Sequence, residues 1–173
     1  MVHAGKFAER ACAPYDLKSR AARRAPPTVM PSIRPLALCV FRDEDRILVF
    51  EGYDPVKKQT FYRPLGGGIE FGETSEQAVR REIREEIDAE ILDLYLLGTL
   101  ENMFVFNGVP GHEIVQLYGG RLDDGHFSGV EQMWARESTG ENLKVVWKAL
   151  DEFSSEIPLY PDGLLELLRR AKP

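Results

Sequence analysis

The amino-acid sequence predicts an α/β fold, and within that class an α+β arrangement in which helices cover a central mixed β-sheet. Short apolar runs bounded by turn residues recur through the middle of the chain, a pattern typical of strands. Two segments, 75–87 and 162–170, instead carry apolar residues at the spacing of amphipathic helices. The chain of 173 residues, 43% of them hydrophobic, is sized for one core.

Strands are expected on both sides of the first helix. Two apolar runs, 36–40 and 47–50, flank the polar turn 42–45 and predict a hairpin. Further strands are predicted at 91–100, 103–106, 112–122 and 144–147, with turns at 107–111 and 123–125. The three glycines from Gly66 to Gly68 are expected to break the chain before the helix.

Both predicted helices carry a recognisable signal. Thr74 and Gln77 have the spacing of a capping box, which predicts a helix from Ser75 to Ile87. The last helix has a stripe of four leucines between residues 164 and 168, which is expected to pack on the sheet as core.

Charge and composition argue against several classes of protein. The formal net charge of -6 disfavours coating of a nucleic acid. Cys12 and Cys39 form no CxxC pair and the three histidines lack zinc-finger spacing, so neither a disulfide framework nor a structural zinc site is expected. We find no apolar run of the about 20 residues that a membrane span needs, and no secretory signal. These features predict a cytoplasmic protein with no membrane association.

Residues 1–30 differ in composition from the rest of the chain. Six basic and two acidic side chains give this segment a net charge of +4, which leaves -10 for residues 31–173. We expect a basic N-terminal extension, disordered or loosely packed, followed by one domain over 31–173. A solvated tail, an organelle-targeting segment and sequence upstream of a start at Met30 all remain open for the extension.

The first helix carries the residues that indicate chemistry. At about 100° per residue, Glu82, Glu85 and Glu86 fall within an arc of about 100° on one face, beside the apolar face of Val79 and Ile83. Three carboxylates so close repel one another unless a cation lies among them. Oxygen ligands without histidine or cysteine favour Mg²⁺ or Mn²⁺.

A solvated charged face, with the glutamates paired to Arg81 and Arg84, is the alternative interpretation of this helix. The preceding glycines favour the metal interpretation, because glycine lets the backbone approach a ligand and a helix N-terminus favours anions. A phosphate-bearing substrate and a carboxylate-held cation could therefore meet there. The segment has neither the lysine of a P-loop nor dinucleotide-binding glycine spacing.

From Gly67 to Ala89 the sequence resembles the signature of the Nudix hydrolases. That signature has a glycine, a glutamate six positions later, an Arg-Glu pair, a Glu-Glu pair and a final glycine before an aliphatic residue. The corresponding residues are Gly67, Glu73, Arg81, Glu82, Glu85 and Glu86, whereas Asp88 replaces the final glycine and Ala89 is a small aliphatic residue. The resemblance implies a Nudix-type α/β/α sandwich, and Asp88 is expected to strain the helix exit without affecting the metal face.

The resemblance also implies a role for most residues of the motif. Glu82, Glu85 and Glu86, with the carbonyl of Gly66, would bind Mg²⁺ or Mn²⁺. Gly67, Glu73 and Arg81 would be structural, with Glu73 and Arg81 forming an ion pair that holds the loop against the helix. The implied reaction is attack of water on a phosphorus of a diphosphate linkage, with no serine or cysteine nucleophile.

Glu85 and Glu86 are expected to be catalytic as well as metal-binding. Two further glutamates are candidates for the general base. Glu141 lies six residues before Trp147, where similar proteins often place the base, and could instead be a further metal ligand. Glu113 is its rival, because it shares a strand face with Val115 and Leu117, where a charge needs an explanation. His112 is a weaker candidate.

The sequence therefore predicts a Mg²⁺-dependent pyrophosphohydrolase acting on a nucleoside diphosphate linked to another moiety. A non-catalytic Nudix-fold module that senses such a metabolite is the alternative, and an isoprenoid diphosphate isomerase is a third for which the expected histidine and cysteine are missing. The expected partner is a small nucleotide or nucleoside diphosphate derivative, and the resemblance also makes a homodimer possible. Substrate-binding residues remain open: five aromatic residues could stack on a base or belong to the core, namely Phe61, Tyr62, Phe104, Phe106 and Tyr118.

Overall fold

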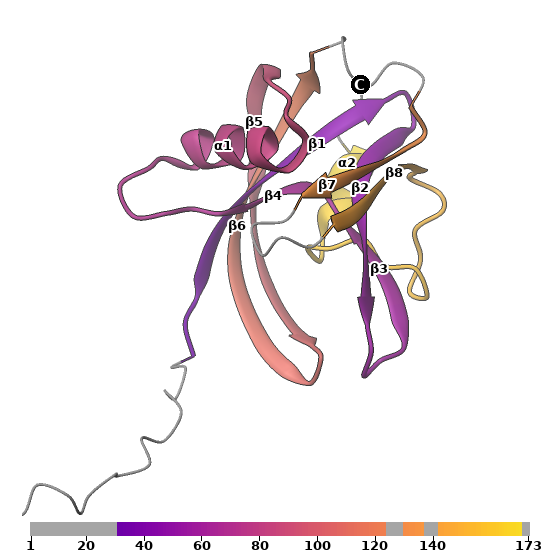
Figure 1. Cartoon of the computed structure of the whole chain (residues 1–173). Coiled ribbons are helices and arrows are strands. Elements are labelled where there is room, and N and C mark those ends of the chain that lie inside the picture. Colours follow the sequence, from indigo (N-terminus) through magenta and orange to yellow (C-terminus); the bar gives the residue numbers. More distant parts are fainter. Residues whose placement is uncertain (1–30, 124–129, 137–141, 171–173) are drawn as a thin grey trace, which may run out of the picture. The chain divides into compact units, whose positions relative to one another are not determined.

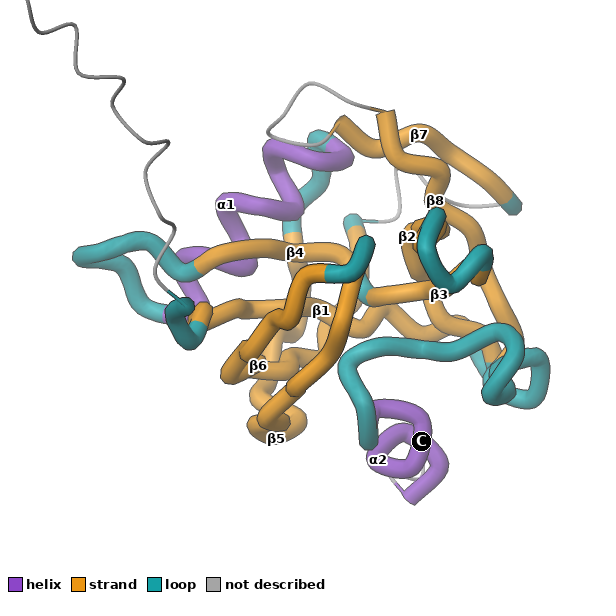
Figure 2. The backbone as a smooth tube through the Cα atoms, turned by 90° about the horizontal axis from the view of Figure 1, so that it is seen from below, coloured by secondary structure: helices purple, strands orange, loops and turns teal. Residues whose placement is uncertain are grey.

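The computed structural model of the chain describes residues 31–123, 130–136 and 142–170. Over these residues it has the predicted α+β fold, with a central mixed sheet and one helix on each side (Figures 1 and 2). The elements in chain order are β1 (Arg34–Asp43), β2 (Arg46–Asp54), β3 (Gln59–Arg63), β4 (Leu65–Gly68), α1 (Ser75–Ile87), β5 (Ile91–Phe106), β6 (Val109–Leu122), β7 (Gln132–Arg136), β8 (Asn142–Ala149) and α2 (Leu164–Arg170).

The sheet divides beyond the predicted hairpin of β1 and β2. Its strand order is β5-β6-β1-β2-β8-β7, and β1 runs parallel to β6 while the other pairs are antiparallel. β1 and β2 pair with each other next to their turn, at residues 42–43 and 46–47. Farther from the turn, β1 pairs with β4 and β2 pairs with β3. Away from the β1–β2 turn the sheet therefore separates into two arms, which are the β2–β3 hairpin and the β5–β6 hairpin.

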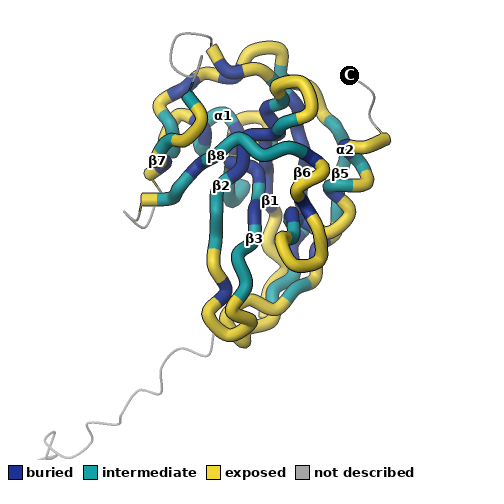
Figure 3. The backbone as a smooth tube through the Cα atoms, turned by 90° about the vertical axis from the view of Figure 1, so that its right-hand side faces the viewer, coloured by how far each residue is buried: buried dark blue, intermediate teal, exposed yellow. Residues whose placement is uncertain are grey.

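Alternating residues of β1 build two cores, one on each face of the sheet. Ala37, Cys39 and Phe41 pack in the core that contains Val79 and Ile83 of α1. The intervening residues face the core that contains α2, where the predicted leucine stripe is buried at Leu164 and Leu168. Buried positions concentrate in the central strands, and the hairpin tips are exposed (Figure 3). Neither described helix is long and apolar enough to cross a membrane.

The observed strands differ from the predicted ones in several places. β5 is continuous from Ile91 to Phe106, where the apolar pattern predicts two strands, because the polar Asn102 between them is buried and bonded across the ladder to Glu113. The glycines expected to break the chain form β4, pairing with β1 as far as Gly68. β3 and β7 are short strands of five residues each, which the apolar pattern did not predict.

Helix α1 has the predicted limits, and both ends are capped. The Thr74 side chain accepts a hydrogen bond from the Gln77 N–H, and the Gln77 side chain accepts from the Thr74 N–H, which completes the capping box. At the other end Asp88 adopts the left-handed conformation (φ 53°, ψ 42°), and its N–H donates to the Arg84 carbonyl. An aspartate thus performs the capping role that glycine fills at lower conformational cost.

The loop between β4 and α1 is fixed to the helix by Arg81. Its guanidinium forms a two-pronged ion pair with Glu73, at 2.7 and 3.2 Å, and donates to the Gly68 carbonyl at 3.0 Å. The bond from Arg81, followed by one from the Glu70 N–H, holds the pKa of Glu73 below its usual value of 4.5. The loop is therefore tied to the helix from both of its ends.

We predict that Asp88→Gly stabilises the protein by roughly 0.5 kcal/mol, because glycine adopts the left-handed conformation without a Cβ penalty. Asp88→Ala keeps that penalty and loses the short polar side chain, so it should destabilise. Urea unfolding of the three proteins measures both changes. Equal stabilities of the Gly and Ala variants would contradict the proposed strain.

Glu73→Gln should lower the free energy of unfolding at pH 7, where the parent carboxylate is ionised and paired. A carboxylate with a depressed folded-state pKa stabilises fully above its unfolded value, here 4.5, and loses this effect as the pH falls through the folded value. The difference between parent and variant should therefore shrink below pH 4.5. Urea titrations between pH 7 and 3 test this, with exposed Glu156→Gln as control. A difference that does not vary with pH would contradict it.

Candidate active site

The acidic strip, defined as Glu82, Glu85 and Glu86, lies where α1 packs against the glycines of β4. A Cβ atom at Gly67 would lie 2.5 Å from the carboxyl carbon of Glu82, so glycine is required for this approach. The Gly66 N–H donates to Glu86 Oε2 at 3.0 Å. Glu85 is more exposed, with 55% of its side-chain surface accessible. The strip therefore borders both backbone and solvent.

Arg81 relieves the repulsion between the carboxylates. Its Nη1 donates to Glu82 Oε1 at 2.9 Å and to Glu85 Oε2 at 3.3 Å. The hydrogen bond to Glu73, the largest cause, and the bond to Glu82 raise the pKa of Arg81 above its usual value, so the guanidinium stays charged. The ion pair expected between Glu73 and Arg81 is thus part of a larger network that includes the strip.

The donor set of the strip fits a hard divalent cation, because its side chains offer carboxylate oxygens. In the part of the chain that the structure describes, no three His, Cys, Asp or Glu side chains are already gathered in a metal-binding arrangement. Glu82 and Glu85 are instead engaged with Arg81, and Glu86 with Gly66. Binding of a cation would exchange these contacts for coordination.

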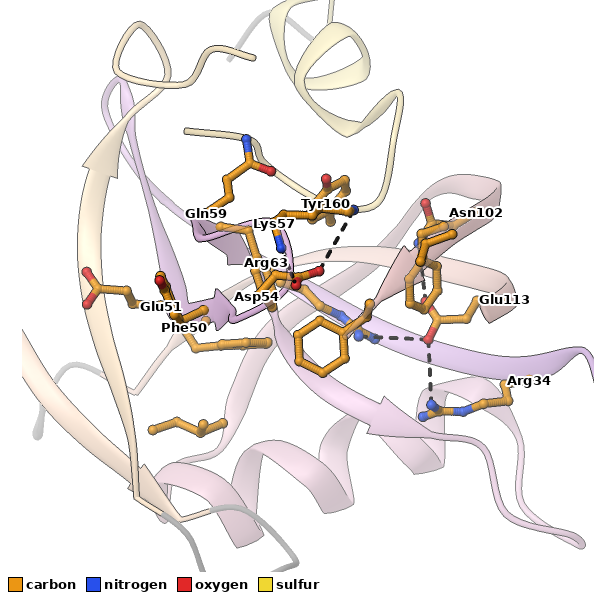
Figure 4. A pocket seen from close by; sticks show the side chains of 17 residues that line it. Arg34, Phe50, Glu51, Asp54, Lys57, Gln59, Arg63, Asn102, Glu113 and Tyr160 are labelled. Atoms are coloured by element: carbon orange, nitrogen blue, oxygen red, sulfur yellow. Dashed lines mark hydrogen bonds and ion pairs between the residues drawn. The ribbon is translucent and has the colours of Figure 1, made fainter. Parts of the chain in front are cut away.

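A second feature is a cavity of about 510 Å³ between the β2–β3 and β5–β6 arms (Figure 4). Its walls include the rings of Phe61 and Phe104, each of which lies across the glycine opposite it in the ladder, Gly52 and Gly111 respectively. Asp54 joins the arms at their tips by accepting from the Asn107 N–H at 3.2 Å. Backbone hydrogen bonds, the one from Lys57 being the largest cause, hold the pKa of Asp54 below its usual value.

Glu113 lies in this cavity and is 2% exposed. Its Oε2 accepts from Asn102 Nδ2 at 3.3 Å, whereas Oε1 is the one buried side-chain polar atom among the described residues that has no hydrogen-bond partner. Arg34 and Arg63 approach Oε1 at 3.8 and 3.9 Å. As predicted, Glu113 shares its strand face with buried Val115, which belongs to the core containing α2.

The other predicted site residues are distributed as follows. Glu141 lies outside the described residues. His112 Nε2 contacts Glu101 Oε1 at 2.8 Å near the surface. Of the five aromatic residues considered for stacking, three line the cavity, namely Phe61, Phe104 and Phe106, and the other two, Tyr62 and Tyr118, are buried in the cores.

Sequence reasoning missed several polar residues of the cavity, among them Arg34, Arg63 and Asn102. Asn102 did give a signal, since it is a polar residue between the two strands predicted at 91–100 and 103–106. Arg34 and Arg63 gave none, because each stands at the end of a strand where a basic residue is ordinarily solvated.

Comparison with known proteins agrees with this geometry. The family model of the NUDIX domain matches residues 32–169. A MutT NUDIX hydrolase from Burkholderia pseudomallei has a similar structure, with 20% identity, a TM-score of 0.57, and coverage of 82% of this chain and 99% of that chain. A NUDIX hydrolase from Nitrosomonas europaea is similar over 80% of this chain and 87% of its own, with 17% identity and a TM-score of 0.56. These two structures share the fold, and because the family model spans nearly all of the described residues, the chain belongs to the Nudix hydrolase family.

Proposed function

We propose that this protein is a Mg²⁺-dependent pyrophosphohydrolase that cleaves the phosphoanhydride bond of a nucleoside diphosphate linked to another moiety. The observation that carries the proposal is the complete acidic strip beside the glycines of β4. A module that only senses a metabolite has no need of three adjacent carboxylates, which repel one another and require compensation. The same donors would accept Mn²⁺.

Glu82, Glu85 and Glu86, with the Gly66 carbonyl, would hold the cation. The bound cation supplies neutralisation of charge on the phosphoryl oxygens and a lowered pKa of the attacking water. Gly67 contributes by having no side chain, which leaves room for the Glu82 carboxylate against the strand. Arg81 orients the strip from one side, and Glu73 orients Arg81 in turn.

We propose Glu141 as the general base that accepts a proton from the attacking water. Its support is its position six residues before Trp147, which lies on β8. Glu113 remains the rival for this role. Its burial in the cavity and its bond from Asn102 fix its carboxylate, as a positioned base requires.

We also propose which part of the chain carries out the reaction, and where in the cell it takes place. We assign hydrolysis to the domain over residues 31–173, with residues 1–30 as an extension that the reaction does not need. The net charge of -6 disfavours a nucleic-acid chain as partner, which leaves a small nucleotide derivative as the proposed substrate class, and we propose the cytoplasm as location.

Glu85→Gln and Glu86→Gln should each lower turnover by more than the roughly 10–100-fold typical of residues that merely support a metal ligand. Both changes keep side-chain shape and remove a charge, so folding should survive. The substrate for this assay is identified first. Product release is measured with and without Mg²⁺ for nucleoside triphosphates, nucleotide sugars, dinucleoside polyphosphates and capped RNA.

Glu90→Gln is the matched control, because Glu90 pairs with Arg84 outside the strip. It should leave turnover unchanged. Parental rates in both strip variants would show that the site is assigned wrongly, and binding of a nucleotide without hydrolysis by the parent would favour the sensing module.

Glu141→Gln should lower turnover by roughly 10²- to 10⁴-fold, the usual contribution of a general base, and leave Mg²⁺ affinity nearly unchanged. Glu113→Gln should lower turnover much less. Steady-state kinetics and Mg²⁺ titrations of both variants test this. Weakened Mg²⁺ binding in Glu141→Gln would make Glu141 a metal ligand, and an active Glu141→Gln with an inactive Glu113→Gln would make Glu113 the base.

A further inference from the structure

We propose that the cavity between the β2–β3 and β5–β6 arms binds a nucleobase that carries an amino group, and that Glu113 Oε1 accepts a hydrogen bond from that amino group. The proposal rests on the proposed function, since this base would belong to the nucleotide whose anhydride is cleaved at the acidic strip. Glu113 would then select the substrate, whereas Glu141 would take the proton from the attacking water.

Glu113 presents an open acceptor in this cavity. Its side chain is buried, and within the parts of the chain that the structure describes Oε1 is the buried side-chain polar atom that lacks a hydrogen-bond partner. Arg34 and Arg63 approach Oε1 at 3.8 and 3.9 Å, which offsets its charge but exceeds the length of a hydrogen bond. An unmet buried acceptor costs free energy, and a donor on a ligand would recover it.

Asn102 determines which of the two carboxylate oxygens is left for a ligand. The Asn102 carbonyl oxygen accepts from the Asp162 N–H at 3.3 Å, which fixes the orientation of the amide. Its Nδ2 therefore faces Glu113 and donates to Oε2 at 3.3 Å. Oε2 is thus satisfied inside the protein, and Oε1 is the oxygen that a ligand donor would meet. Asn102 and Glu113 lie together at one end of the cavity (Figure 4).

The rest of the cavity suits a flat ring. Its volume of about 510 Å³ falls in the range of about 300–1,000 Å³ that is typical of small-molecule sites. Phe61 and Phe104 line it, and each ring packs over the glycine opposite it in the ladder. Phe61 also makes edge contacts with Phe50 and Phe106, at centroid distances of 6.3 and 5.8 Å. Rings held in this way can stack on a nucleobase with little further loss of side-chain freedom.

An amino group is the donor that this arrangement favours. An ionised carboxylate accepts hydrogen bonds and has no proton to donate, so Glu113 Oε1 disfavours a ring carbonyl or an unprotonated ring nitrogen at the same place. Two further carboxylates that line the cavity are already bonded within the protein, Asp54 to backbone N–H groups and Glu51 to Tyr62 and Lys144. Recognition of the amino group therefore falls to Glu113.

The cavity also lies within reach of the acidic strip. Arg63 lines the cavity and precedes Gly66 by three residues, so their Cα atoms lie at most about 11 Å apart. The Gly66 N–H in turn donates to Glu86 of the strip. A sugar and a phosphate chain attached to a base in the cavity can bridge this separation.

The test compares two pairs of nucleoside monophosphates, which contain no anhydride bond for the proposed activity to cleave. Adenosine and purine riboside monophosphates differ by one amino group, as do guanosine and inosine monophosphates. Calorimetry on the full chain without a divalent cation gives the ratio of affinities within each pair. We expect the amino-bearing member of at least one pair to bind about 10-fold more tightly or better, as a hydrogen bond to a charged acceptor contributes.

Glu113→Gln removes the acceptor and keeps the side-chain shape. Because Asn102 donates to one end of the side chain, the new amide turns its oxygen to Asn102 and its NH₂ group to the position of Oε1. A donor then faces the amino group of the base, so the preference within the pair should vanish or reverse. Glu51→Gln is the matched control, because it removes a carboxylate of the same cavity that is bonded to Tyr62 and Lys144, and it should keep the parental ratio.

A structural role of Glu113 alone, as the anion beside Arg34, would weaken both members of a pair and leave their ratio unchanged. An unchanged ratio in Glu113→Gln, an equal change in Glu51→Gln, or no amino preference of the parent in either pair would each overturn the site. If Glu113→Gln fails to fold, NMR of the parent with an isotope-labelled amino nucleotide decides. We expect a nuclear Overhauser effect between the amino protons and the Asn102 side chain, and its absence would overturn the site.

These outcomes are distinct from failure of the proposed function. An amino preference that depends on Glu113, in a protein without hydrolytic activity, would leave the site standing and remove the hydrolase. Hydrolysis by a parent that shows no preference within either pair would do the reverse.

Discussion

The close approach of α1 to the glycines of β4 is the constraint on which the site depends. Glu82 lies in space that a side chain at Gly67 would need, and Glu86 accepts a hydrogen bond from the backbone of Gly66. These contacts place three carboxylates together, and Arg81 is required to offset their repulsion while it also ties down the preceding loop. Helix position, loop conformation and site charge are therefore set by the same few groups.

The sequence predicted those parts of the fold that depend on local patterns. The capping box gave the start of α1, and the apolar pattern gave the first hairpin. Glycine was misinterpreted because its usual effect is to end regular structure, whereas both glycines lie in a strand: a Cβ at Gly67 would collide with the Glu82 carboxylate of α1, and a Cβ at Gly66 with the Ala37 carbonyl of β1. That requirement lies in tertiary contacts and has no local signature.

The same distinction holds for the two candidate sites. The strip could be predicted because its residues are neighbours on one helix, with fixed spacing. The cavity could not, since Arg34, Asn102 and Glu113 are far apart in sequence and meet through the register of β1, β5 and β6. The sequence did give clues in Glu113, a charge on the strand face of Val115 and Leu117, and in three of the aromatic residues considered for stacking, Phe61, Phe104 and Phe106.

The rings of Phe61 and Phe104, which lie across glycines, affect how the ligand specificity of this protein could change. Phe61 and Phe104 rest on Gly52 and Gly111, so a methyl group at either glycine would force the ring to move. The width of the cavity is thus governed by backbone positions on the opposite strands as well as by the residues that would touch a ligand. Selection for a larger or smaller substrate can act through these two glycines and leave the acidic strip untouched.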